Sequence, residues 1–493
     1  MPQPTAFHDL GALCFGSRAQ FEPGHLEEVC EAVRGSGVRD LYVVVHGAHN
    51  DAATGAAVDG AFRDLLTEAW GDDARDKGML GVHWPSLCFR DEGVPGLTEP
   101  TGDAQDGDPR PSLSRATIED LCRQLPDSVA PLKRIAELLD ERPERQLAFD
   151  DFGSALRSLA ELPLQDPAAE FTADTEGEVL PQADPLMLFE DTRTMCSEFA
   201  GALRDVRHAL EAGEGKPARH ENDVDKSDVS DGGSLQETRT AGPRPARPLS
   251  KRVGRTGTVV AGGPLGEEAR ATDLAELWKG AHELFRQVVR HVLRRRAGLI
   301  GQEGLGPCLP VLAEGAEIRL HLVGHGLGAR LAGFALRGLE TGGAEPVTLS
   351  SLTLLQGEMS HFAFADILPQ QVSGHGALWN RQRLVQGPLL CTFSHLDSHL
   401  GVLYPLSAQM MGDSAELATT ARKWGALGFD GVQGVDGPPP VALSGVTEED
   451  PWELPYLNVD ASEVVRSDDV PMGGHHHVFH PEIGRLLRWA AGH

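Results

Sequence analysis

The sequence lacks any long hydrophobic run. No stretch approaches the roughly 18 consecutive apolar residues that a membrane-spanning helix requires. The N-terminal residues, MPQPTAFHDLGALCFG, have neither the basic region nor the apolar region of a secretory signal peptide. We therefore expect no transmembrane segment and a cytoplasmic location, with export by a route that needs no signal peptide as the remaining alternative.

Paired cysteines and an excess of basic residues are also missing. The seven cysteines are scattered and odd in number, without a C-x-x-C pair, which favours buried free thiols over a disulfide framework. The 44 Lys and Arg residues are outnumbered by 73 Asp and Glu residues, for a net charge of −29. This charge argues against nucleic acids and anionic membrane surfaces as non-specific partners.

The middle of the chain differs in composition from its two ends. Residues 91–114 are rich in Pro, Gly and acidic residues and predict a flexible linker. Residues 115–163 and 185–213 are amphipathic and predict helices. Residues 214–256 are almost free of large apolar side chains, so we expect them to be disordered. The predicted organisation is a first part of the core at 1–90, an inserted helical cap at 91–270 and a second part of the core at 271–493.

The two ends of the chain predict an α/β fold, with a mostly parallel sheet flanked by helices. Short apolar runs bounded by turn residues are typical of buried parallel strands. They occur at 41–45, 79–86, 318–323, 347–355, 389–394 and 457–461. A strong apolar stripe predicts a helix over 272–297, which leads back from the cap into the core. Its basic end, Arg290–Arg296, fits arginine side chains that stabilise the dipole of a helix C-terminus.

The stretch Ala316–Leu336, AEIRLHLVGHGLGARLAGFAL, predicts a strand, a glycine-rich turn and a helix. This is the geometry of a nucleophile elbow, where a catalytic side chain sits on a sharp turn between strand and helix. Gly324 and Gly328 would allow the strand and the helix to pass close together. The pattern is G-x-S-x-G, and here Gly326 stands where the serine belongs.

A second pattern fits the same residues. Gly324, Gly326 and Ala329 match the relaxed dinucleotide-binding fingerprint G-x-G-x-x-G/A, which also lies between a strand and a helix. That fingerprint requires an acidic residue at the end of the next strand, whereas the strand at 347–355 ends in Gln356-Gly357. A nucleotide-binding oxidoreductase is therefore the weaker alternative.

The residues LVGHGLGARLAG closely resemble the elbow of the α/β-hydrolase superfamily, in its lipase and esterase branches. Further stretches occur in the order of that family. They are His46-Gly47 after a strand, Trp84-Pro85-Ser86 after the next strand, and Ser394-x-x-Asp397 after a later one. The resemblance covers roughly residues 38–90 and 275–493.

This resemblance implies roles for particular residues. The elbow would comprise Gly324, His325, Gly326 at the nucleophile position, and Gly328. Backbone N–H groups near Gly47 or Ala48, and at Leu327, would form the oxyanion hole. Asp397 would be the catalytic acid and His475 the base, because nucleophile, acid and histidine follow in that order. Asp397 also fits a helix N-cap, and the two roles are compatible.

Gly473-Gly474-His475-His476-His477 precedes the last predicted helix, and His476 and His477 are alternatives for the base. A metal site and a solvated loop without a role are two other interpretations. No second His, Cys or Glu group appears at ligand spacing in the sequence, so we predict no metal and no cofactor.

The functional prediction is a Ser-Asp-His hydrolase scaffold for small-molecule or lipid carboxylic esters, which lacks its serine at Gly326. Glycine has no hydroxyl group that could attack a carbonyl carbon. The alternative from a different class is a catalytically inactive pseudoenzyme. It would bind a ligand in the former pocket, or a protein partner through the cap.

Overall fold

The computed structural model describes most of the chain. The described residues are 7–22, 24–48, 52–86, 89, 113–161, 166–176, 191–211, 267–315, 317–339, 348–368, 374–411, 425–446, 456–466 and 473–492. Most of the predicted linker at 91–114 and all of the segment at 214–256 lie outside these residues. Within the described residues, no helix combines the length and apolarity needed to cross a membrane.

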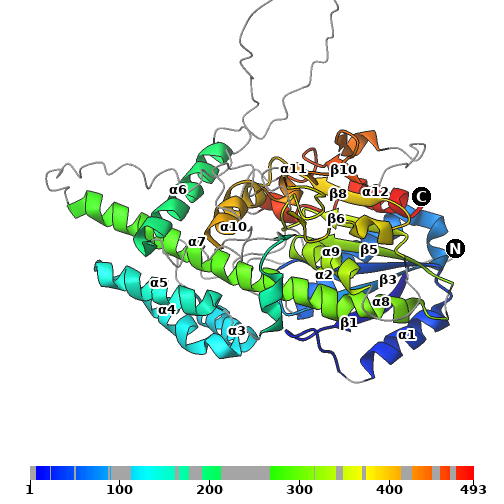
Figure 1. Ribbon diagram of the computed structural model, residues 1–493, viewed down its shortest axis with the longest axis horizontal. Helices are drawn as coiled ribbons and strands as arrows, with labels where there is room; N and C mark the ends of the chain where they lie inside the picture. The colour runs from blue at the N-terminus through cyan, green and yellow to red at the C-terminus, as the bar shows by residue number, and fades with distance from the viewer. Residues whose placement is uncertain are drawn as a thin grey trace, which may run out of the picture.

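An eight-stranded sheet flanked by helices forms one part of the molecule, and a further group of helices lies beside it (Figure 1). Its strand order is β1-β3-β2-β5-β6-β8-β10-β9, and every pairing within it is parallel. The strands are β1 (His8–Cys14), β2 (Asp40–Val45), β3 (Lys77–His83), β5 (Arg319–His325), β6 (Ser351–Leu355), β8 (Leu389–Phe393), β9 (Val441–Ala442) and β10 (Leu457–Asp460). Two further short strands, β4 (Thr175–Glu176) and β7 (His375–Gly376), pair antiparallel. The prediction of an α/β fold with a mostly parallel sheet is confirmed.

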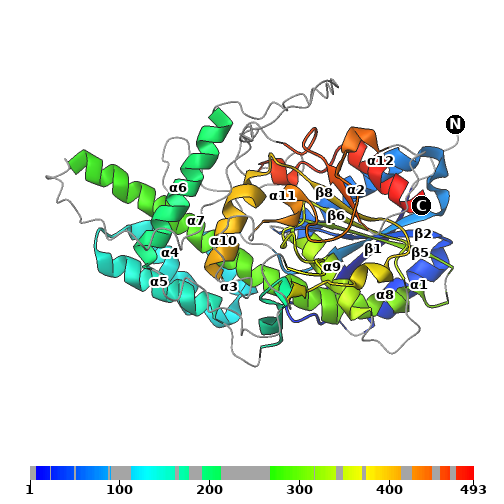
Figure 2. The ribbon, with the colours of Figure 1, turned by 45° about the horizontal axis from the view of Figure 1, so that its top comes forward.

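Helices cover both faces of the sheet. The longer helices are α1 (His25–Ser36), α2 (Ala52–Trp70), α3 (Arg115–Gln124), α4 (Val129–Glu141), α5 (Gln146–Ala160), α6 (Thr192–Glu211), α7 (Glu267–Leu299), α8 (Gly306–Ala313), α9 (Leu327–Gly338), α10 (Tyr404–Met411) and α12 (Pro481–Gly492). Helices α2 and α12 lie on one face, and α1, α8 and α9 lie on the other (Figure 2). The described residues also form short helical turns: η1 (Gly71–Asp76), η2 (Pro126–Ser128), η3 (Pro167–Phe171), η6 (Ile300–Leu305), η7 (Arg381–Leu384), η8 (His399–Leu403), α11 (Leu427–Asp430), η10 (Leu443–Gly445) and η11 (Gly473–His476).

The alternation of side chains along β2 explains why both faces are covered. Successive residues of a strand point to opposite faces of a sheet. Tyr42 and Val44 pack in the core cluster that includes α2 and α12, whereas Leu41, Val43 and Val45 pack in the larger cluster with α1 and α9. Because β2 is buried on both faces, its sequence is a continuous apolar run.

Helices α3 to α6 pack along α7, to one side of the sheet (Figures 1 and 2). Their apolar side chains belong to the same core cluster as one face of the sheet. Trp278 of α7 stacks on Phe149 of α5 with ring centroids 4.7 Å apart. The predicted helices in 115–163 and 185–213 are therefore present, and α7 joins them to the sheet.

The expectation for Arg290–Arg296 holds only for Arg296, which lies in the last turn of α7. The other arginines lie further from that end, and α7 continues through a π-helical turn, η6, into α8. Arg290, Arg294, Arg295 and Arg296 are all buried. Arg295 and Arg296 donate to backbone carbonyls of distant segments, and the other two bind carboxylates. These hydrogen bonds and ion pairs hold α7 against the segments that pack on it.

Candidate active site

The glycine-rich turn between β5 and α9 has the geometry of a nucleophile elbow. Gly326 has φ 56° and ψ −119°, a conformation that residues with a side chain rarely adopt. Its N–H donates to the carbonyl of Leu355 at 3.0 Å, and its own carbonyl accepts from Glu358 N–H at 3.1 Å. The strand, turn and helix predicted for this stretch are confirmed, and the backbone at Gly326 is held from both sides.

Gly324 and Gly328 let the strand and the helix approach closely. A Cβ atom at Gly324 would lie 2.4 Å from the carbonyl oxygen of Gly328. A Cβ atom at Gly328 would lie 2.3 Å from the carbonyl oxygen of Val45 and 2.5 Å from that of His46. No side chain fits at these distances, so both positions require glycine, as expected from the sequence.

The structure brings Asp397 and His475 together at the same end of the sheet. Asp397 follows β8, His475 lies in η11 before α12, and the two side chains are at most 3% exposed. Nδ1 of His475 lies 2.8 Å from Oδ2 of Asp397. The other carboxylate oxygen, Oδ1, accepts the backbone N–H of Leu400 at 3.0 Å. Asp397 therefore caps a helical turn and binds His475 at once.

His475 also faces the nucleophile position. A Cβ atom built on Gly326 would lie 2.9 Å from Nε2 of His475 and 4.0 Å from Cα of Gly47. Acid, histidine and residue 326 thus form a continuous line from β8 to the elbow. Of the three histidines predicted as candidates for the base, His475 binds Oδ2 of Asp397.

The loop after β2 borders the same position. Val45 pairs with Gly324 in the sheet, so His46 and Gly47 emerge beside the elbow. His46 donates from Nδ1 to the carbonyl of Gly47 at 2.9 Å, and Trp84 donates to the carbonyl of His46 at 3.0 Å. Burial lowers the pKa of His46 to about 4, so its ring is neutral at physiological pH. These contacts fix the backbone of the loop next to the site.

The N–H groups proposed for an oxyanion hole come from two elements. Leu327 is the first residue of α9, where backbone N–H groups have no acceptor within the helix. Ala48 lies one residue beyond Gly47 and is buried. Both are next to the residues that surround position 326.

A buried group of charged residues behind His475 was not found from the sequence. Glu358 follows β6, and its carboxylate binds Arg290 of α7 at 2.9 Å, with both side chains 2% exposed. His399 lies 3.5 Å from the same carboxylate, and its ring centroid is 5.3 Å from that of His475. Burial alone would raise the pKa of Glu358, but Arg290, His399 and His475 together outweigh it and hold the pKa well below its usual range.

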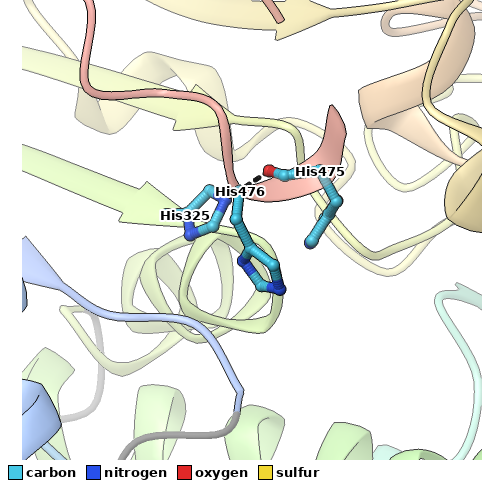
Figure 3. Close-up of side chains that lie close together, drawn as sticks. All are labelled: His325, His475 and His476. Carbon is cyan, nitrogen blue, oxygen red and sulfur yellow. Dashed lines mark hydrogen bonds between the residues drawn. The ribbon is translucent and has the colours of Figure 1, made fainter. Parts of the chain in front are cut away.

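Two further histidines lie beside His475 (Figure 3). His325, within the elbow, donates from Nε2 to the carbonyl of His475 at 2.9 Å. One ring nitrogen from each of His325, His475 and His476 lies within 4.8 Å of the others, and all three residues are buried. Burial, with the neighbouring charge of His475, lowers the pKa of His325 to about 3. The search for metal ligands by sequence spacing missed His325, because it precedes His475 by 150 residues.

No protein-family model, no curated protein and no solved structure matches this chain. The function must therefore be inferred from the geometry of the site. That geometry combines a hydrogen-bonded Asp–His pair, a glycine with positive φ in front of it and backbone N–H groups on two sides. Such a set can accept a proton from a nucleophile and stabilise negative charge on an oxygen.

Proposed function

We propose that this chain is a carboxylic ester hydrolase scaffold of the α/β-hydrolase type, in which Asp397 and His475 are the acid and the base and Gly326 occupies the nucleophile position. The observation that carries the proposal is the alignment of these groups. Nδ1 of His475 lies 2.8 Å from Asp397, and Nε2 lies 2.9 Å from the Cβ position of residue 326. A hydroxyl group carried at that position would be within reach of the base.

The strand order supports this proposal. The elbow follows β5, Asp397 follows β8 and His475 comes after β10, and these strands lie in the order β5-β6-β8-β10. Since the strands are parallel, their carboxyl ends meet at one edge of the sheet, where ligands of open α/β sheets bind. Nucleophile position, acid and histidine also follow each other along the chain as in α/β-hydrolases.

Gly326 closes the covalent route through an acyl-enzyme and leaves room for water. A water oxygen near the vacant Cβ position would lie within hydrogen-bonding distance of Nε2 of His475. His475 would take one proton of that water while its oxygen bonds to the acyl carbon. Asp397 would stabilise the resulting imidazolium. The alkoxide would then leave and take up the proton from His475, which gives an acid and an alcohol.

The same glycine favours a second candidate, a binding module that has lost catalysis. The pocket would then hold an ester or acyl group without turnover. The nucleotide-binding alternative has less support, because the acidic residue after β6, Glu358, is buried against Arg290 and is not available to a ribose.

The decisive experiment compares ester hydrolysis by the chain, Gly326→Ser and Gly326→Ala, with short and long acyl chains and with EDTA present. The alanine variant is the matched control, because it adds the same Cβ atom and the same backbone strain without a hydroxyl. We expect Gly326→Ser to exceed Gly326→Ala by at least about 100-fold, because a triad that lacks its serine retains only a small part of its rate. The gain should vanish in Gly326→Ser combined with His475→Ala.

A folded serine variant that is no faster than the alanine variant would overturn the hydrolase proposal. Binding of a non-hydrolysable acyl analogue by the unmodified chain would then support the binding module. The acyl chain length that gives the highest turnover would identify the ester class.

A further inference from the structure

The three histidines beside the elbow offer nitrogen ligands to a metal ion. We propose that His325, His475 and His476 bind a divalent transition-metal ion of the zinc class, next to the vacant position at Gly326. This goes beyond the proposed function, and the binding itself does not rest on it. The three side chains come from two segments of the chain and meet at the carboxyl end of β5 (Figure 3).

The donor set selects the type of ion. Imidazole nitrogens suit zinc, copper, nickel and iron, whereas magnesium and calcium prefer oxygen ligands. Three histidines with an open fourth position also form a catalytic type of zinc site. Zinc–nitrogen distances of about 2.0–2.1 Å in a tetrahedral site place the nitrogens about 3.4 Å apart. The ligand nitrogens lie within 4.8 Å of one another, so binding requires them to approach by at most about 1.4 Å.

The surroundings of two of these histidines resemble those of metal ligands. A histidine that binds a metal usually donates its other ring N–H to a carboxylate or a backbone carbonyl. His475 directs Nδ1 to Asp397 at 2.8 Å, which leaves Nε2 as its ligand atom. His325 donates from Nε2 to a backbone carbonyl at 2.9 Å, which leaves Nδ1 unprotonated.

Two glycines lie next to these nitrogens. A Cβ atom on Gly326 would lie 2.9 Å from Nε2 of His475, and a Cβ atom on Gly47 would lie 3.2 Å from Nδ1 of His325. Cα of Gly47 in turn lies 4.0 Å from the Cβ position of Gly326. A side chain at Gly326 would lie directly against Nε2 of His475, so glycine at this position leaves that nitrogen accessible to an ion.

The charge of the site is compatible with a cation. Asp397 is buried beside His475 and supplies a negative charge close to the proposed ion. Metal binding and general-base catalysis exclude each other at Nε2 of His475, since a nitrogen that binds the metal cannot accept a proton. Zinc should therefore inhibit any hydrolysis that depends on His475.

Metal binding can be measured on the full chain after dialysis against EDTA. Zinc is titrated in competition with a chromophoric chelator, and cobalt is added in a second titration to follow the visible absorption of a tetrahedral site. The variants are His476→Ala, Gly326→Ala and, as a matched control on the same loop, His477→Ala. Near-ultraviolet circular dichroism establishes that each variant is folded.

We expect one equivalent of zinc to bind, and His476→Ala and Gly326→Ala to weaken binding by about tenfold or more. His477→Ala should change the affinity by less than about twofold. The proposal is overturned if the unmodified chain shows no saturable binding. It is also overturned if His477→Ala weakens binding as much as His476→Ala, because the ion would then bind to the loop as a whole.

The ester assay separates this proposal from the proposed function. Zinc binding by a chain whose Gly326→Ser variant is silent would support the metal site and overturn the hydrolase. Ester turnover by Gly326→Ser, together with no zinc binding by the unmodified chain, would support the hydrolase and overturn the metal site. If both hold, zinc should inhibit Gly326→Ser, and EDTA should restore its turnover.

Discussion

Replacement of Asp174 by asparagine should destabilise the protein strongly. Asp174 is fully buried between α7 and α9. Its Oδ1 atom binds Arg330 at 2.8 Å, and Oδ2 accepts from Arg294 at 3.2 Å and from the backbone N–H of Ser360 at 2.8 Å. A single carboxylate thus links the elbow helix, the long helix and the segment after β6.

The magnitude follows from the burial of all three charges. The side chains of Asp174, Arg294 and Arg330 are at most 4% exposed, so water cannot replace the lost carboxylate. Removal of one partner from a buried ion pair costs about 3–5 kcal/mol. Asparagine keeps the size of the side chain, so we assign this loss to the charge and not to a cavity.

The loss of stability caused by Asp174→Asn should also depend on pH. Burial alone would raise the pKa of Asp174, but Arg330 and Arg294 outweigh burial and lower it below 3.8. The stabilisation is therefore present at pH values above 3.8 and is lost as the pH falls through the pKa of the folded state. The difference in the free energy of unfolding between the unmodified protein and Asp174→Asn should be constant from pH 7 to pH 5 and should become smaller below pH 4.

Urea-induced unfolding of both proteins measures this difference, and Glu176→Gln provides the matched control. Glu176 lies two residues further along and binds another arginine of α9, Arg337, at 2.9 Å. That pair is exposed, with 49% of the Glu176 side chain accessible, so its loss should cost less than about 1 kcal/mol. If Asp174→Asn lowers the free energy of unfolding by no more than Glu176→Gln does, the buried ion pairs of Asp174 do not stabilise the packing of α7 against α9.

Two further predictions concern the loop and the turn beside the site. His46→Gln should reduce the loss of stability in acid. Burial, with a smaller effect of His83, lowers the pKa of His46 to about 4, although the hydrogen bond to the Gly47 carbonyl and the charge of Asp59 oppose this. The unfolded chain therefore binds a proton that the folded chain does not. The unmodified protein should therefore lose about 2 kcal/mol more than His46→Gln between pH 7 and pH 5, and equal losses in urea unfolding would contradict this. Gly328→Ala should lower the free energy of unfolding by about 3 kcal/mol or more, since its Cβ atom would collide with the carbonyl of Val45; a loss below about 1 kcal/mol would show that strand and helix can separate.

The parts of the fold that local sequence determines were predictable. The buried strands are short apolar runs between turn residues, and they pair in parallel as such runs do. Gly324 and Gly328 could be placed at a tight turn because only glycine tolerates such close backbone contact. Asp397 could be chosen because Ser394-x-x-Asp397 after a strand resembles the acid-bearing strand and loop of α/β-hydrolases.

The buried ion pairs could not be predicted, because their partners are far apart in the sequence. Arg290 and Glu358 are separated by 68 residues, and Arg294 and Asp174 by 120. A run of arginines in a helix is usually exposed, so the burial of Arg290, Arg294, Arg295 and Arg296 could not be expected from the sequence. Only the three-dimensional arrangement shows that α7 passes between the added helices and the sheet, where each arginine meets an acceptor.

The contacts among the histidines of the site could not be predicted either, because His325 lies far from His475 and His476 in the sequence. The same histidines take part in both the proposed hydrolysis and the proposed metal binding. From the sequence, His325 was the variable residue of a glycine turn and His476 an alternative base. In the structure both lie against His475, whose Nε2 atom faces the vacant Cβ position of Gly326. A serine at this position would use that nitrogen as a base, whereas a glycine leaves it accessible to an ion. Under the two proposals, the identity of residue 326 decides between hydrolysis and metal binding at one nitrogen atom. Gly326→Ser should then raise the rate of hydrolysis and weaken metal binding in the same protein.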